Sequence, residues 1–161
     1  MKFQKLNRIK DVNAKKADWV TESDIYLLIK TGGKHKGLVS QARRLGKGNI
    51  MYEKNKHDVP KIMWFANFRD KIKNENIECL TNYIYCDLDE ITNTEQIKDE
   101  LRQFPFIRAI WKSFGGKGLG FVVMCDNVTI DNYKDIYHAI GKCIGYDLCD
   151  NACKLTQGNV L

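Results

Sequence analysis

Two aspartates separated by one residue, Asp87 and Asp89, end a short apolar run in the middle of the chain. If residues 82–89 form a β-strand, alternate side chains point to opposite faces, so both carboxylates share a face with Tyr83 and Tyr85. The apolar residues between them then point the other way, into a core. Two neighbouring carboxylates repel each other unless a positive charge lies between them. The pair therefore predicts either a divalent-metal site or a solvent-exposed strand end.

A glycine-rich segment follows further along the chain, Ser113-Phe-Gly-Gly-Lys-Gly-Leu-Gly120. Because glycine permits positive φ and lets a ligand come close to the backbone, free amides here could surround a phosphate beside Lys117. The segment is not a P-loop, because its spacing differs and it is expected to join two strands. A flexible hairpin that binds nothing is the alternative interpretation.

Together the two motifs suit nucleotidyl transfer. In that chemistry two metal ions activate an attacking 3′-oxygen and stabilise the leaving pyrophosphate, and they need several carboxylates as hard oxygen ligands. A third acid is therefore expected near the pair. The chain is expected to return to the sheet after its last helix, which makes Asp150 the first candidate and Asp147 the second.

The first 80 residues contain the elements that must support this site. Residues 1–20 show no clear period and predict a loosely packed arm. Thr21–Lys30 has a capping pattern followed by an apolar face, which predicts a helix that ends at glycines. A second short helix is expected around Leu38–Leu45, before a polar loop at 54–60. The apolar and aromatic run over 61–68 predicts a strand.

From residue 82 onward the expected order is strand, helix, strand, hairpin, strand, helix. The ranges are 82–89, a helix opened by a capping box at Thr92–Glu95, then 106–113, 119–125 and 131–144. This order is most of a split β-α-β-β-α-β unit, whose first and third strands are central neighbours. We therefore expect an α+β fold with an RRM-like antiparallel sheet core and a basic N-terminal α/β extension. The aspartate pair would lie beside the glycine hairpin.

The basic charge of the chain is concentrated in its N-terminal half. The 161 residues suffice for one domain with a substantial core, and their formal charge is +6. Residues 34–73 carry most of the excess, and such a segment could hold nucleic acid through salt-sensitive contacts that ignore sequence. The candidates for these contacts are Arg43, Arg44, Lys54, Lys56 and Lys61. A solvated surface without a partner is the alternative.

Several classes of protein are disfavoured by composition. No apolar stretch is long enough to cross a membrane, and the N-terminus lacks the apolar core of a signal peptide. The six cysteines are irregularly spaced and several lie in apolar runs, which indicates reduced core residues of a cytoplasmic protein. A zinc site is an alternative, although its spacing matches no common zinc pattern. Its ligands would be His138, Cys143, Cys149 and Cys153.

The two motifs also carry a family resemblance. Tyr85-Cys-Asp-Leu-Asp89, followed by Ser113–Val123, resembles the archaeo-eukaryotic primase superfamily. Within that superfamily the chain is most similar to the VirE N-terminal domain family of bacterial mobile elements and phages. The similarity extends upstream through Met51–Ile62 and downstream to Asp150–Lys154, and it covers roughly residues 35–161.

The resemblance implies one primase-like domain over residues 21–161, with a basic subregion at 21–80 and an RRM-like catalytic core at 81–161 that is truncated at its C-terminus. It implies template-dependent primer synthesis or DNA polymerisation, in the replication of a phage or mobile element in the bacterial cytoplasm. Single-stranded DNA template and nucleoside triphosphates would be the substrates, and a helicase domain or protein would be a partner.

By match of position, the resemblance implies that Asp87, Asp89 and Asp150 are catalytic and bind two Mg²⁺ or Mn²⁺ ions. The residues that would bind the phosphates of the nucleotide are Ser113, Gly115, Gly116, Lys117 and Gly118. Two departures from the family remove phosphate contacts. The hairpin has no histidine, and no arginine follows the segment that begins at Asp150.

Two other functions stay open. Lys117–Met124 nearly fits the third-strand signature of RNA-recognition modules, which stack bases on exposed aromatic side chains. Of the expected aromatics only Phe121 is present. A primase-like domain could also bind single-stranded nucleic acid or nucleotide without catalysis, since a fold does not establish an activity.

Overall fold

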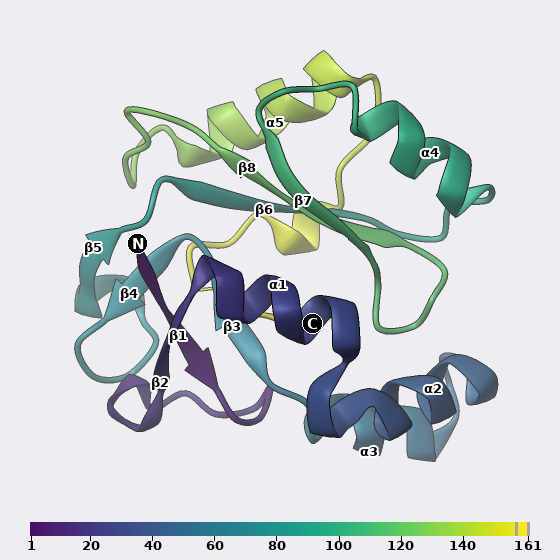
Figure 1. The fold of residues 1–161 in the computed structure, drawn as a ribbon. Coiled ribbons are helices and arrows are strands. Elements are labelled where there is room, and N and C mark those ends of the chain that lie inside the picture. The colour runs from purple at the N-terminus through teal and green to yellow at the C-terminus, as the bar shows by residue number, and fades with distance from the viewer. Residues whose placement is uncertain (157, 161) are drawn as a thin grey trace.

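The structure is a computed structural model that describes residues 1–156 and 158–160. It has the predicted α+β class, with three antiparallel sheets and flanking helices (Figure 1). The strands are β1 (Lys2–Leu6), β2 (Asp18–Thr21), β3 (Lys61–Met63), β4 (Ala66–Phe68), β5 (Ile77–Leu80), β6 (Tyr83–Leu88), β7 (Ile107–Lys112), β8 (Leu119–Met124) and β9 (Gly158–Val160). The helices are α1 (Glu22–Thr31), α2 (Lys36–Leu45), α3 (Ile50–His57), α4 (Thr94–Leu101) and α5 (Tyr133–Ile144).

The central sheet has the strand order β6-β8-β7, so the first and third strands after residue 82 are neighbours, as predicted. β6 and β8 are antiparallel, with Asp87 opposite Gly120. Helices α4 and α5 cover one face of this sheet, and Ile84, Cys86 and Leu88 are buried beneath them (Figure 1). The alternation predicted for β6 is therefore confirmed.

The N-terminal sheet has the order β2-β1-β3-β9, and it corrects the arm predicted for residues 1–20. β1 lies inside this sheet, paired with β2 on one side and with β3 on the other. Phe3 and Leu6 of β1 are almost completely buried. The arm prediction was wrong because pairing between β1 and β3 joins residues far apart in the sequence, and such pairing leaves no local period.

The two sheets pack together through aromatic side chains. The ring centroids of Phe3 and Trp64, from the N-terminal layer, lie 5.2 and 6.1 Å from that of Tyr83 on β6. Trp64 also lies 5.8 Å from Trp111 of β7. The face of the central sheet that carries the aspartates is thus covered over part of its area, and the end of β6 opens into a cleft.

Helices α2 and α3 pack beside the glycine hairpin. α3 covers residues 50–57, the second half of which was predicted to belong to a polar loop at 54–60. Asn49 caps it by accepting a hydrogen bond of 2.9 Å from a first-turn amide, and Tyr52 packs against Phe114 with ring centroids 5.5 Å apart. The loop prediction was wrong because α3 buries only Tyr52 and Asn55, and two residues are too few to give a helical period of apolar side chains.

The predicted capped start of α1 and the predicted capping box at 92–95 have different outcomes. At the start of α1, Thr21 and Asp24 each accept a hydrogen bond from the other's backbone amide, so the predicted cap is confirmed and takes the form of a capping box. No box forms at 92–95, because α4 follows Asn93 in a left-handed conformation with φ of 57° and without a side-chain cap. A glycine does end α1, at Gly32.

Two strand predictions need correction as well. The run at 61–68 is not one strand but two, β3 and β4, which belong to different sheets. The last strand, β9, pairs with β3 of the N-terminal sheet and so does not complete the central sheet as a split β-α-β-β-α-β unit would. The RRM-like and primase-like descriptions of the fold stay predictions.

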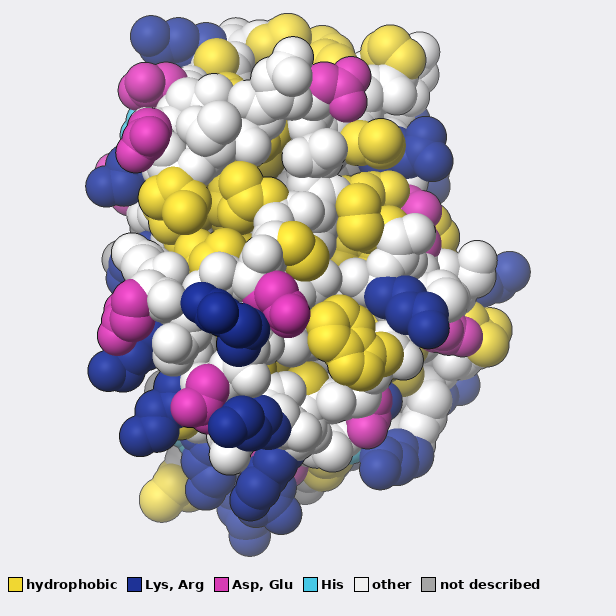
Figure 2. All heavy atoms as spheres, turned by 90° about the vertical axis from the view of Figure 1, so that its left-hand side faces the viewer, with side chains coloured by type: hydrophobic (Ala, Val, Ile, Leu, Met, Phe, Trp, Pro, Cys, Tyr) yellow, Lys and Arg dark blue, Asp and Glu magenta, His cyan; other side chains and the backbone are white. Residues whose placement is uncertain are grey.

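One face of the surface is mixed in charge. Figure 2 shows basic side chains gathered at the lower end of the molecule, at the height of α2 and α3, with acidic and basic side chains interspersed across the middle. Among the helices that the structure describes, none combines the length and the apolar character that crossing a membrane requires.

Candidate metal and phosphate site

The aspartate pair and the glycine hairpin line one cleft of about 180 Å³. Asp87 and Asp89 reach it from the end of β6, and the hairpin between β7 and β8 supplies Ser113, Gly115 and Lys117. The other lining residues are Ile9, Lys47, Tyr52, Lys56, Tyr85, Phe114, Gly158 and Asn159. The structure thus brings together two motifs that are separate in the sequence, as the sequence predicts.

The hairpin keeps backbone amides without acceptors. The Ser113 amide donates to the Gly118 carbonyl, and the Gly116 amide donates to the Ser113 carbonyl, both at 2.9 Å. In the part of the chain that the structure describes, no oxygen accepts a hydrogen bond from the amides of Phe114, Gly115 or Lys117. Successive free amides beside a lysine form a site for an anion, and a phosphate fits this description.

Glycine lets the hairpin lie directly on the strand end that carries the aspartates. A Cβ on Gly118 would lie 2.3 Å from the carbonyl oxygen of Leu88, and a Cβ on Gly115 would lie 2.8 Å from the hydroxyl of Tyr52. The carbonyl of Lys117 also accepts a hydrogen bond of 3.0 Å from the amide of Ile91. The hairpin and the end of β6 that carries the two aspartates are therefore held in a fixed position relative to each other.

Asp87 lies in an environment that disfavours its charge. Burial raises its pKa to about 6, and the neighbouring carboxylate of Asp89 acts in the same direction. The Tyr85 hydroxyl, Lys47 and Lys56 lower the pKa and offset part of this effect. One of the carboxylate oxygens, Oδ1, is buried and has no hydrogen-bond partner among the described residues. A divalent cation beside this oxygen would relieve both the burial and the repulsion.

Lys47 is a cleft residue that the sequence prediction did not include. Its Nζ lies 3.9 Å from Asp89 Oδ2 and 3.7 Å from Glu90 Oε1. Because the side chains of both Lys47 and Asp89 are about half exposed, this is a loose surface pair and not a fixed counter-ion. The signal in the sequence was a lysine between two glycines, at 46 and 48, within the basic segment 34–73.

Asn159 also lines the cleft and was absent from the sequence prediction. It lies on β9, is only 5% exposed, and its Oδ1 has no hydrogen-bond partner in the described chain. Carboxylate and amide oxygens are ligands that Mg²⁺ and Mn²⁺ prefer, so Asp87, Asp89 and Asn159 are the cleft residues of the right chemistry to hold such an ion. The described residues form no group of three acidic, histidine or cysteine side chains able to hold a metal, so here the third ligand would be an amide.

The predicted third acids lie elsewhere. Asp150 and Asp147 line a separate hollow beside the end of α5, together with His138 and Tyr146. The Cys149 amide does donate to the backbone carbonyl of Asp87 at 3.0 Å, so the chain returns to β6 as expected. The next residue turns away into a 3₁₀ turn, and its carboxylate does not line the cleft.

The five predicted nucleic-acid contacts lie in different environments. Lys56 lines the cleft, and Arg43 donates to the carbonyls of Lys112 and Ser113 at 3.2 and 3.1 Å. Lys61 is buried in β3, and burial lowers its pKa. The remaining two, Arg44 and Lys54, are exposed and line neither the cleft nor another described hollow.

The aromatic side chains of the central sheet are not available for stacking on bases. Phe121 is completely buried on the face covered by α4 and α5. Tyr83 and Trp111 lie on the opposite face but are buried against the N-terminal sheet. Tyr85 is the aromatic residue of β6 that lines the cleft. The RRM-like alternative therefore lacks the exposed platform that it requires.

The zinc alternative also finds no support among the described residues. His138 and the three cysteines form no ligand group there. Cys143 is exposed whereas Cys153 is buried, so these two thiols lie in different environments. All six cysteines are free.

Residues 54–147, more than half of the chain, match the family model described as "BT4734-like, N-terminal domain". The matched segment includes Asp87, Asp89 and the whole glycine hairpin, and it ends before Asp150 and Asn159. Comparison with curated proteins and with solved structures gave no match.

Proposed function

The chain belongs to the BT4734-like N-terminal domain family, and from the cleft, whose aspartates and hairpin lie in the matched segment, we propose that it is a divalent-metal-dependent nucleotidyltransferase. The substrates would be nucleoside triphosphates and a single-stranded DNA template, on which the protein starts or extends a primer. One observation carries the proposal. Asp87, which has a buried carboxylate oxygen without a partner among the described residues, shares a cleft with a hairpin in which the amides of Phe114, Gly115 and Lys117 are free.

Asp87, Asp89 and Asn159 would hold the metal, which when bound neutralises charge on the attacking oxygen and on the leaving pyrophosphate. The free amides of the hairpin and Lys117 would bind the phosphates of the incoming nucleotide. The 3′-hydroxyl would lose its proton to solvent as its oxygen bonds to the α-phosphorus, and the bond from that phosphorus to pyrophosphate would break. Lys47 and Lys56 are placed to balance the negative charge that collects in the cleft.

The biological setting follows from the resemblance to primases. In this proposal the protein acts in the replication of a phage or mobile element in the bacterial cytoplasm, with a helicase domain or protein as its partner. The loss of hairpin histidine and of a downstream arginine would be compensated by the lysines that line the cleft, Lys47, Lys56 and Lys117. This compensation is part of the proposal.

Nucleotide incorporation on primed and unprimed single-stranded DNA, with Mg²⁺ or Mn²⁺, tests the function. We expect Asp87→Asn combined with Asp89→Asn to lower incorporation by at least about 100-fold, since both oxygen ligands lose their charge. Asp126→Asn combined with Asp131→Asn removes the same charge from exposed positions outside the cleft and should leave incorporation unchanged. Incorporation that survives the first pair of substitutions would contradict the proposal.

A second candidate function is binding of nucleotide without catalysis. It is favoured by the position of Asp150, which leaves the cleft with two carboxylates in place of three. Wild-type protein that binds nucleoside triphosphate in a metal-dependent manner but incorporates none would support this candidate. Metal-dependent incorporation by the wild type would exclude it.

A further inference from the structure

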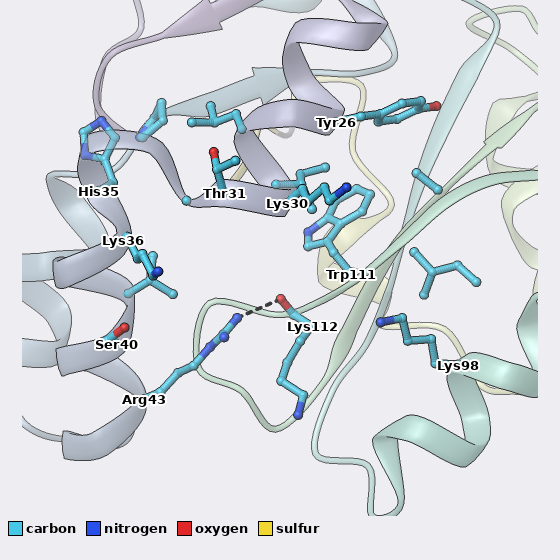
Figure 3. Close-up of a pocket in the computed structure, with 17 residues that line it drawn as sticks. Tyr26, Lys30, Thr31, His35, Lys36, Ser40, Arg43, Lys98, Trp111 and Lys112 are labelled. Atoms are coloured by element: carbon cyan, nitrogen blue, oxygen red, sulfur yellow. Dashed lines mark hydrogen bonds between the residues drawn. The ribbon is translucent and has the colours of Figure 1, made fainter.

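A second, larger groove of about 560 Å³ lies between α1 and α2 on one side and β7 and α4 on the other (Figure 3). Residues 109–112 of β7 line it, and β7 is an edge strand of the central sheet. Its volume is within the range of ligand sites in proteins. The function proposed above makes no use of this groove.

Positive charge follows both sides of the groove. Lys30, Lys36 and Arg43 line it from α1 and α2, and Lys98 and Lys112 line it from the opposite side (Figure 3). None of its described lining residues is acidic. Cations spread along two walls, without convergence on one point, suit a ligand with repeated negative charges.

Most of this charge is not neutralised by the protein. Lys112 lies 3.6 Å from Glu95 and is partly balanced. Among the described residues, no carboxylate lies within ion-pair distance of Lys30, Lys36 or Lys98. Like charges held along one groove repel each other, so a polyanion that lies between them would gain from both walls.

The groove and the cleft lie on either side of the glycine hairpin. Arg43 reaches across from α2 to the carbonyls of Lys112, which lines the groove, and of Ser113, which lines the cleft. The Arg43 side chain also lies 3.2 Å from the position that a Cβ on Gly116 would occupy. The hairpin and Arg43 therefore lie between the two hollows, so a chain molecule held in the groove would lie beside the hairpin that also lines the cleft.

We propose that this groove binds the sugar–phosphate backbone of a single-stranded nucleic acid beside the hairpin that lines the cleft. The inference rests on the proposed function only in that the bound strand would be the template. A peptide added to the edge of β7 is the rival occupant. It is disfavoured because Arg43 already occupies the carbonyls at one end of that edge, and because the lysines on both walls suit phosphates.

Fluorescence anisotropy with a labelled oligothymidylate of about 20 nucleotides, in EDTA and over a salt titration, tests this site. We expect Lys30→Gln, Lys36→Gln and Lys98→Gln together to raise the Kd by at least about tenfold. The slope of log affinity against log salt should become less steep by about 2, since each lost phosphate contact on a single strand accounts for about 0.7.

The matched control replaces three exposed lysines outside both hollows, in Lys10→Gln, Lys16→Gln and Lys134→Gln. This variant has the same net charge, so it should bind the oligonucleotide nearly as the wild type does. Equal weakening in the two triple variants would overturn the proposal, because the effect would then be one of net charge.

The Asp87→Asn, Asp89→Asn double variant separates this inference from the function. It should bind the oligonucleotide in EDTA at least as well as the wild type, because it keeps every groove lysine. If the wild type incorporates no nucleotide but the groove variant still loses binding, the proposed chemistry fails and the groove stands. If incorporation is confirmed but the groove variant binds normally, the groove inference fails alone.

Discussion

Asp87 is the residue on which the candidate site depends most. Strand alternation was enough to predict that it and Asp89 would share a face, because a period of two is a local property of the sequence. Its buried, unpartnered oxygen could not be predicted, because that burial comes from β9 and the hairpin, which are distant in sequence. Asn159 was missed for the same reason, since one asparagine near a chain end carries no pattern of its own.

The raised pKa of Asp87, about 6 against an ordinary 3.8, makes stability depend on pH in a definite direction. The folded state binds this proton more tightly than the unfolded state does, so stability from this group falls as pH rises from about 4 to about 6. Above about pH 6 the Asp87 carboxylate is ionised in both the folded and the unfolded state, so burying its charge lowers the free energy of unfolding by the full amount. We expect Asp87→Asn in EDTA to be more stable than the wild type at pH 8 by about 1 kcal/mol, with no advantage near pH 4.

Urea unfolding at pH 8 and pH 4 measures this difference. The control is Asp131→Asn, which removes an exposed carboxylate outside the cleft and should change stability little at either pH. A loss of stability in Asp87→Asn of equal size at both pH values would show that the carboxylate is satisfied in the folded protein.

Asn159 should contribute to metal binding. Asn159→Ala removes an oxygen from the cleft, and we expect the Kd for Mn²⁺ to rise by about tenfold, as measured by calorimetry. Asn67 provides a matched control, because its Oδ1 is also buried and unpartnered but lies outside the cleft. Asn67→Ala should leave the Kd unchanged, and equal weakening in both variants would remove Asn159 from the site.

Among the elements, the glycine hairpin shows how much of the site could be predicted from the sequence. Four glycines around one lysine predicted a close backbone approach, and the hairpin does lie on the end of β6. Helix α3 could be predicted only in part, because Tyr52 packs on a hairpin residue that lies far along the chain. Its packing partner and not its own sequence fixes that helix.

The closest approach in the hairpin gives a prediction at this scale. Gly118→Ala places a Cβ 2.3 Å from a backbone oxygen of β6, so the backbone must shift. We expect a loss of about 2 to 3 kcal/mol in the free energy of unfolding and weaker binding of nucleotide. Gly37→Ala is the matched control, because nothing lies within 4 Å of its Cβ in α2.

The control should gain about 0.5 to 1 kcal/mol, since alanine favours a helix interior over glycine. Both variants can be measured by urea unfolding beside the wild type. A Gly118→Ala protein as stable as the wild type would mean that the hairpin does not press against β6.

At the scale of the whole molecule, strands from the two ends of the chain meet in one sheet, and no local sequence pattern predicts this pairing. β1 and β9, from opposite ends of the described chain, both pair with β3. The order of elements from β6 to α5 was predictable, because each element there carries its own period and turn residues. The N-terminal sheet was not, and it is this layer that covers the aspartate face and leaves the cleft at its edge.

Phe3 tests whether the two layers fold as one unit. It is fully buried, and its ring lies 5.3 Å from that of Trp64 and 5.2 Å from that of Tyr83, so it joins the sheets. We expect Phe3→Ala to lower the free energy of unfolding by about 3 to 5 kcal/mol, because the cavity would form at the contact between the layers. Lys2→Ala, at an exposed position on the same strand, should cost far less.

Unfolding should be followed by tryptophan fluorescence and by far-ultraviolet circular dichroism on the same samples. Trp64 and Trp111 lie 5.8 Å apart between the two sheets, so the fluorescence reports on the contact between the layers, whereas the dichroism reports on helices throughout the chain. One domain predicts coincident transitions in the wild type and in both variants. If Phe3→Ala separates the two signals, the layers are independent units, and the cleft between them is held by less than the packing described above.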